Sequence, residues 1–160
     1  MKTKNNDSNI TNSNEMELDK KKYEFLEHTA DIYVASYGKN LSEVFENAAL
    51  ALFDVMTDVK KIDRKFVEKV KVKGQDDFAL LYNWLECFIL KFEIENKLFS
   101  KFKVNEIKMK NSEFYLKASI YGECFNPRKH PSKVGIKAIT YHNMKIEHNG
   151  YFVAKFLLDI

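Results

Sequence analysis

The chain has 160 residues, 45% of them hydrophobic, and a formal net charge of +3 at pH 7. This length favours a single domain with a substantial hydrophobic core. So small a net charge argues against a protein dedicated to nucleic acid, and the lack of a long apolar run argues against a membrane protein.

The beginning of the chain and its cysteines indicate the cellular setting. No hydrophobic signal region is present, and Cys87 and Cys124 lie far apart without a CxxC motif. A disulfide framework or a structural zinc site is therefore not indicated, and we expect an intracellular protein, cytoplasmic or nuclear. Residues 1–22 are rich in Asn, Ser, Asp and Lys, which predicts a disordered leader before one domain at residues 23–160.

The first part of the predicted domain contains two strands and a helix. The strands are expected at Tyr23–Leu26 and Ile32–Tyr37. Asn40 then has the character of an N-cap, with Glu43 in the capping-box position. Apolar residues at helical spacing follow, which predicts an amphipathic helix at about residues 41–57.

The next segments are a strand and a second helix. In the strand Phe66–Lys73, lysines alternate with valines, which is typical of the solvated face of a half-buried strand. The helix begins after a cap at Asp76 or Asp77, and its apolar residues from Phe78 to Phe92 predict deep burial. Glu93, Glu95 and Lys97 lie near its predicted end.

The remainder of the chain is strand-like. The predicted segments are 101–110, 113–121, 136–141, 144–147 and 151–159. A change of parity between Val104 and Ile107 predicts a bulge in the first of them, and Asn149-Gly150 predicts a hairpin turn before the last. Two helices and about six or seven strands favour an α+β fold, a two-layer sandwich in which the helices cover one face of a mostly antiparallel sheet.

Acidic groups stand at both ends of the predicted domain. Asp31 lies between the first two strands, in the run Glu27-His-Thr-Ala-Asp31, and Asp159 is followed by Ile160 and its α-carboxylate. If these groups converge, a metal ion or a basic side chain must offset their repulsion. Ligands made only of oxygen favour Ca²⁺ or Mg²⁺ over Zn²⁺. The alternative is that Asp159 is simply exposed at a frayed terminus.

Two further residues are candidates to support such a site. Lys137 lies on a semi-buried face of its predicted strand, where it is either a snorkelling side chain or a cation beside the acids. His28 lies close to Asp31, although for all four histidines a surface or hydrogen-bonding role is the simpler interpretation. No nucleophile elbow, P-loop or dinucleotide fingerprint is present, which argues against an enzyme.

Several runs resemble the signatures of the archease family and occur in the same order. The resemblance extends from about residue 23 to residue 160. The runs are Tyr23-Glu-Phe-Leu-Glu-His-Thr-Ala-Asp-Ile32, Gly38-Lys-Asn-Leu-Ser-Glu-Val-Phe-Glu-Asn-Ala-Ala-Leu-Ala-Leu-Phe53, Leu80-Leu-Tyr-Asn-Trp-Leu-Glu86, Lys137-Ala-Ile-Thr-Tyr-His142 and Leu158-Asp-Ile160.

The resemblance implies a non-enzymatic activator of an RtcB-type RNA ligase, which joins tRNA halves with GTP and Mn²⁺. Such an activator promotes guanylylation of the ligase histidine and restores multiple turnover, and it meets tRNA only through the ligase. The resemblance also implies a metal site made by Asp31, Asp159 and Ile160, with Lys137 and His28 in support. We expect a divalent cation there, Ca²⁺ first and Mg²⁺ or Mn²⁺ as alternatives, in a protein that is monomeric when free and binds no membrane.

One loop departs from the family pattern. Asn126 and Arg128 stand where the family is often acidic, which argues against a further metal contact from that loop.

The alternative function is an RNA-binding or chaperone-like module acting on tRNA or a tRNA-processing enzyme, suggested by aromatic residues and lysines on the strands. A hydrolase with paired carboxylates is disfavoured because no nucleophile or general base is paired with them.

Overall fold

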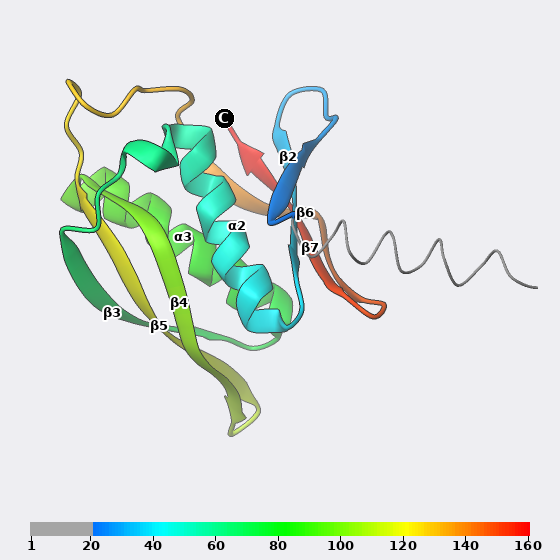
Figure 1. Ribbon diagram of the computed structural model, residues 1–160. Helices are drawn as coiled ribbons and strands as arrows, with labels where there is room; N and C mark the ends of the chain where they lie inside the picture. The colour runs from blue at the N-terminus through cyan, green and yellow to red at the C-terminus, as the bar shows by residue number, and fades with distance from the viewer. Residues whose placement is uncertain (1–20) are drawn as a thin grey trace, which may run out of the picture.

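The computed structural model describes residues 21–160, which form seven strands, two α-helices and one short 3₁₀ helix (Figure 1). The helices are α2 (Leu41–Met56), η1 (Val59–Lys61) and α3 (Asp77–Glu95). The strands are β1 (Tyr23–Leu26), β2 (Ile32–Gly38), β3 (Phe66–Gly74), β4 (Lys97–Lys110), β5 (Glu113–Cys124), β6 (Ala138–His148) and β7 (Phe152–Asp159). Residues 1–20 of the predicted leader lie outside the described residues.

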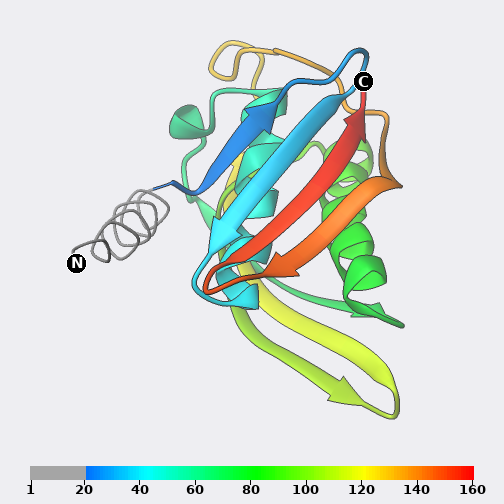
Figure 2. The ribbon, with the colours of Figure 1, turned by 90° about the vertical axis from the view of Figure 1, so that its right-hand side faces the viewer.

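The strands form two antiparallel sheets, with the helices between them. One sheet has the order β1-β2-β7-β6 and the other the order β3-β5-β4. Helix α2 packs against β2 and β4, and α3 packs against β3 and β6, so each helix contacts both sheets (Figure 1). Figure 2 looks onto the four-stranded sheet, with the helices behind it.

The expected α+β class, with two helices and seven antiparallel strands, is confirmed. The strands are divided between two sheets instead of forming one. The reason lies in α2, whose consecutive buried residues Ala51, Leu52 and Phe53 point to different sides of the helix. A helix that is apolar on several sides needs cover on more than one of them. In the part of the chain that the structure describes, no helix has the length and apolar character needed to cross a bilayer.

The predicted helix starts are confirmed by their caps. The side-chain oxygen of Asn40 accepts a hydrogen bond from the Glu43 amide at 2.9 Å, and that of Asp76 accepts one from the Ala79 amide at 2.7 Å. Each cap satisfies an amide that the first turn leaves without a partner. Helix α3 ends at Glu95, within the stretch predicted for its end.

Three strands differ by more than one residue from the prediction, and one of them, β5, continues to Cys124 beyond its predicted end at residue 121. β4 begins at Lys97, four residues early, because its first residues pair with the end of β5, and its predicted bulge is confirmed as a register shift between Val104 and Glu106. The two segments predicted after the proline loop are one strand, β6, whose pairing with β7 shifts register between Thr140 and Lys145.

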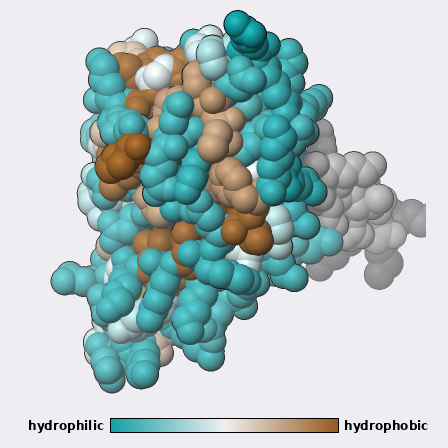
Figure 3. All heavy atoms as spheres, turned by 90° about the vertical axis from the view of Figure 1, so that its left-hand side faces the viewer, coloured by the Kyte–Doolittle hydropathy of each residue, from teal (hydrophilic) through white to brown (hydrophobic). Residues whose placement is uncertain are grey.

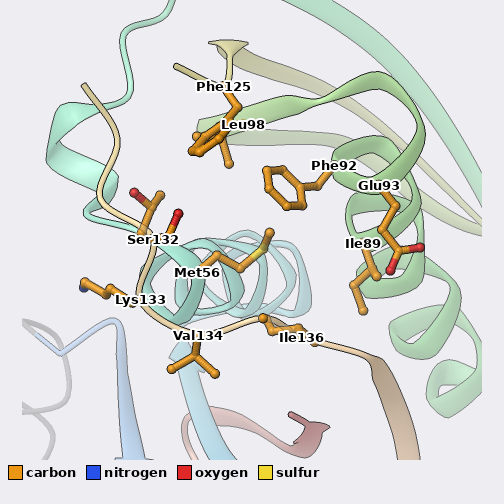
Figure 4. A pocket seen from close by; sticks show the side chains of 12 residues that line it. Met56, Ile89, Phe92, Glu93, Leu98, Phe125, Ser132, Lys133, Val134 and Ile136 are labelled. Carbon is orange, nitrogen blue, oxygen red and sulfur yellow. The ribbon is translucent and has the colours of Figure 1, made fainter. Parts of the chain in front are cut away.

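An apolar cavity of about 270 Å³ lies under the loop that connects β5 to β6 (Figure 4). Thr57, the residue that ends α2, contributes to its wall and is 2% exposed. Its hydroxyl makes no hydrogen bond to any residue that the structure describes. A buried hydroxyl without a partner costs about 1–3 kcal/mol of stability. The other lining residues are Met56, Ile89, Phe92, Glu93, Leu98, Phe125, Ser132, Lys133, Val134, Gly135 and Ile136.

Replacing Thr57 by Val is expected to stabilise the protein by about 1 kcal/mol, because an isosteric methyl group takes the place of the unpaired hydroxyl. Urea unfolding measures the change. Thr57→Ser is the matched control: it keeps the hydroxyl, removes a buried methyl group, and should cost about 1 kcal/mol. A destabilised Val variant would show that the hydroxyl is hydrogen-bonded in solution.

Candidate functional site

The fold brings the two predicted acids to adjacent strand ends. β2 pairs with β7 in a register that ends at Ile32 opposite Leu158. Continued by one residue, this register sets Asp31 opposite Asp159, at roughly the 5 Å between Cα atoms of neighbouring antiparallel strands. Leu158 is fully buried and Ile32 packs against the core, so the strand ends that carry both acids are anchored.

Lys137 lies on the other side of Asp159. Its amide donates a hydrogen bond to the Asp159 carbonyl at 2.8 Å, and the next residue, Ala138, pairs directly with Asp159. The end of β7, with Asp159 and Ile160, therefore lies between the starts of β2 and β6. Figure 2 shows this arrangement at the C-terminal end of β7. We call this region, made of Asp31, Asp159 and the α-carboxylate of Ile160, the acidic sheet end.

His28 lies on the same face of the sheet as Asp159 but is linked to it only indirectly. Its ring meets the Tyr33 ring edge-on, with 6.0 Å between centroids. Tyr33 pairs with Leu157, two residues before Asp159, so Tyr33 and Asp159 share one face. The Tyr33 hydroxyl also donates to the Asn143 carbonyl at 3.1 Å, which holds the ring over the sheet. A direct role of His28 at the acidic sheet end stays a prediction.

A second acid, Asp54, lines the same surface hollow as Asp31, and it was not predicted from the sequence. Asp31 lines a surface hollow together with Asp54 of α2 and Lys133 of the loop before β6. The Asp54 carboxylate lies 3.4 Å from the Lys133 ammonium and accepts a hydrogen bond from the Tyr23 hydroxyl at 3.0 Å. Burial and this contact raise the pKa of Tyr23 well above its usual range, so Tyr23 stays a donor. The sequence signal that could have revealed Asp54 is an acid within the apolar run of helix α2.

The donor groups of the acidic sheet end are all oxygen atoms, the type of ligand that a hard divalent cation takes. Within residues 21–160, no group of three or more His, Cys, Asp or Glu side chains is placed to hold a metal ion. The acidic sheet end offers two carboxylate side chains and one α-carboxylate. Mg²⁺ is often held by one or two carboxylates with water completing its shell, and Ca²⁺ accepts carboxylates and water. The exposed Asp159 leaves room for such waters.

A buried acid, Glu123, forms a separate network that the sequence reasoning also missed. Its carboxylate is 3% exposed and accepts from Lys65 at 2.8 Å, from Lys129 at 2.5 Å and from the amide of Asp63 at 2.8 Å. It also lies 2.9 Å from His130 Nε2. The other ring nitrogen of His130 accepts from a backbone amide at 2.9 Å, so Nε2 carries the proton and donates to Glu123.

This network anchors the loop after β5. Burial alone would raise the pKa of Glu123, but the hydrogen bonds from Lys129, Lys65, Asp63 and His130 outweigh it and hold this pKa far below its usual range. His130 was expected to have a surface or hydrogen-bonding role, and the structure shows the second, in a buried position. With its oxygens occupied by these donors, Glu123 has a structural role.

The comparisons with known proteins agree on one family. Residues 23–160 match the model of the Archease protein family (MTH1598/TM1083). The chain is 49% identical to the protein archease of Sulfurisphaera tokodaii over 140 residues, 87% of this chain and 99% of that protein. It is 44% identical to the protein archease of Pyrococcus furiosus over 142 residues, 88% of this chain and 99% of that protein. The chain belongs to the archease family.

Solved structures show the same fold. The solution structure of Methanobacterium thermoautotrophicum protein 1598 has a TM-score of 0.75 and 34% identity, covering 87% of this chain and 99% of that one. The crystal structure of an archease from Thermotoga maritima, titled a possible chaperone, has a TM-score of 0.56 and 23% identity, covering 84% and 94%. The expected family is thus confirmed. The roles of Asp31, Asp159, Ile160, Lys137 and His28 within this archease fold stay predictions.

Replacing Glu123 by Gln is expected to lower the free energy of unfolding by about 2–4 kcal/mol at pH 7, because a buried, charge-assisted network loses its acceptor charge. Because the folded-state pKa is lowered, the carboxylate stabilises the fold above its ordinary pKa of 4.5 and loses this effect as the pH falls below it. The difference between wild type and variant should therefore begin to shrink below about pH 5 and keep shrinking as the pH falls toward the lowered folded-state pKa.

Urea unfolding across this pH range tests the prediction. Glu147→Gln is the matched control, because its side chain is 56% exposed on β6 and its loss should change stability by less than about 0.5 kcal/mol. Equal, small effects of the two substitutions would contradict a structural role of the Glu123 network.

Proposed function

We propose that this protein is a non-enzymatic activator of an RtcB-type RNA ligase and that the acidic sheet end is the part that acts on the ligase. In this proposal the protein promotes GTP-dependent guanylylation and multiple turnover of the ligase in tRNA splicing. Membership of the archease family supports it. The observation that carries it is the pairing of β2 with β7, whose register ends at Ile32 opposite Leu158, next to Asp31 and Asp159.

The position of these acids suits action on a partner. Asp159 is exposed and ends a strand, so it can reach into the active site of another protein. Behind it, Leu158 and Ile139 are buried neighbours on β7 and β6, and they fix the strand end that carries the acid. Acids held by a packed core are already oriented before the partner binds, which lowers the entropic cost of placing them.

The acidic residues would hold a divalent ion between them. Asp31 and Asp159 would supply oxygen ligands from two adjacent strand ends, and the α-carboxylate of Ile160 would supply a third. When bound, the ion would add positive charge that neutralises triphosphate oxygens during attack by the ligase histidine. Lys137 is held next to Asp159 through its backbone, so its ammonium can pair with one acid or contact the ligase.

Asp31→Asn and Asp159→Asn should each reduce activation at least about tenfold, because each removes a charged ligand and keeps the side-chain shape. The assay follows the transfer of labelled GMP to the cognate ligase with GTP and Mn²⁺, with and without this protein. Glu147→Gln is the matched control, since it removes one negative charge from the same sheet away from the acidic sheet end.

Thermal unfolding of each variant confirms that it is folded, and calorimetric titration with Ca²⁺, Mg²⁺ or Mn²⁺ measures binding of the ion. Wild-type activation by both folded Asn variants would sink the proposal. Lost activation with unchanged ion binding would show that the acids act by direct contact with the ligase and not by holding the ion.

Removing Ile160 should also abolish activation, because it moves the α-carboxylate one residue back along β7. Ile160→Val is the matched control, because it keeps the carboxylate in place and shortens the side chain by one methylene group. The same guanylylation assay applies to both proteins. Equal activation by the two would exclude the α-carboxylate from the site.

A further inference from the structure

A second charged surface lies on the three-stranded sheet. We call the outer side of this sheet, which faces away from the helices, the basic sheet face. Its exposed lysines come from all three strands. They are Lys69, Lys71 and Lys73 on β3, Lys117 on β5, and Lys101, Lys103, Lys108 and Lys110 on β4.

The strand register puts these lysines on one face. Lys71 pairs with Lys117, and Ser119 pairs with both Lys69 and Lys103. Directly paired residues of antiparallel strands point to the same side of the sheet. The alternate residues are apolar and face the helices, as the buried Val72, Leu116 and Val104 show. The alternation of lysines with apolar residues, which the sequence of β3 alone indicates as an ordinary solvated face, thus occurs in register on β4 and β5 as well.

The charge on this face is large for a chain of this composition. Eight lysines stand against two glutamates, Glu106 and Glu113, whereas the whole chain has a formal net charge of only +3. The rest of the chain is therefore net negative, and the total charge hides the concentration of lysines. Figure 3, which views the left-hand side of Figure 1, where β3 lies, shows hydrophilic residues around several hydrophobic patches.

Two tyrosines occupy the central strand of the basic sheet face. The Lys71 and Lys73 ammonium groups lie 4.8 and 5.1 Å from the centre of the Tyr115 ring, and Lys101 lies 5.0 Å from that of Tyr121. Stacking of a nucleic-acid base on an aromatic ring is stronger than a cation–π contact at an exposed site. A base can therefore displace the ammonium group, which remains close enough to meet the phosphate of the same nucleotide.

The bulge in β4 adds neutral polar groups between the lysines. It turns Asn105 toward Ser119, whose hydroxyl lies 3.1 Å from the Asn105 amide nitrogen and 2.6 Å from the Lys69 ammonium. Asn105 and Lys69 line a shallow hollow together with Lys71, Lys117 and the carboxylate of Glu106. Amide, hydroxyl and ammonium donors together are the groups that bind phosphate oxygens in proteins.

We propose that the basic sheet face binds single-stranded RNA, with lysines on phosphates and with Tyr115 and Tyr121 stacking against bases. The two tyrosines are six residues apart on β5, roughly 20 Å at the rise of an extended strand, which is enough for a few nucleotides. An acidic protein would also be attracted to the lysines, but it would gain nothing from aromatic rings that stack bases. The inference does not depend on the ligase proposal, because it concerns the protein alone.

Fluorescence anisotropy with a labelled 20-nucleotide single-stranded RNA tests the inference on the full chain. The face variant combines Lys71→Gln, Lys103→Gln and Lys117→Gln. The matched control combines Lys60→Gln, Lys61→Gln and Lys145→Gln, which removes the same charge from exposed positions elsewhere. We expect the face variant to lose at least about tenfold in affinity and the control about twofold or less.

The salt dependence gives a second readout. Each lost phosphate contact lowers the slope of log affinity against log salt by about 0.7 for a single strand, so the face variant should lose roughly 2 units of slope. The double variant Tyr115→Leu with Tyr121→Leu should also weaken binding about tenfold, because stacking is lost and the lysines remain.

Several results would overturn the inference. They are no RNA binding by the wild type, equal losses in the face and control variants, RNA binding unchanged by the tyrosine substitutions, or competition by poly-glutamate at the same charge concentration as RNA. The last would assign the face to an acidic protein. Asp31→Asn and Asp159→Asn should keep full RNA binding, which separates this surface from the acidic sheet end.

Discussion

The pairing of β2 with β7 is the constraint on which the acidic sheet end depends. These strands come from opposite ends of the described chain, and their register puts Val34 opposite Phe156 and Ile32 opposite Leu158. A slip of one residue would turn the buried side chains of both strands to the outside, so burial fixes the register strongly. The position of Asp31 relative to Asp159 thus follows from the packing of residues that carry no charge.

The local structure was readable from the sequence, whereas the division into sheets was not. Caps at Asn40 and Asp76, helical spacing and the parity change in β4 each act within a few residues, and each is present in the fold. Alternation tells which face of a strand is apolar but not which strand lies beside it. The same alternation of apolar and polar residues is therefore compatible with two sheets that enclose the helices and with a single sheet that the helices cover.

The same distinction separates the charged groups that were predicted from those that were missed. Asp31 and Asp159 stand out because they adjoin strand ends and family motifs. Glu123 does not, since its partners Lys65 and His130 lie on either side of it in the chain and meet it only through the folded loops. The lysines and aromatic residues of the strands suggested RNA binding from the sequence, but only the register shows that those of β3, β4 and β5 share one face.

The two charged surfaces can act independently because the helices lie between them. A helix is about 10 Å across, and a sheet on each side brings the outer face of one sheet to roughly 20 Å from that of the other. At physiological salt, charges are screened over about 8 Å, so the lysines would do little to alter the affinity of Asp31 and Asp159 for the proposed cation. Under the two proposals, one molecule would present acids to a protein partner and lysines to RNA at the same time. For an activator of an RNA ligase, this arrangement would leave the acidic sheet end free to reach the enzyme while the opposite sheet holds the RNA.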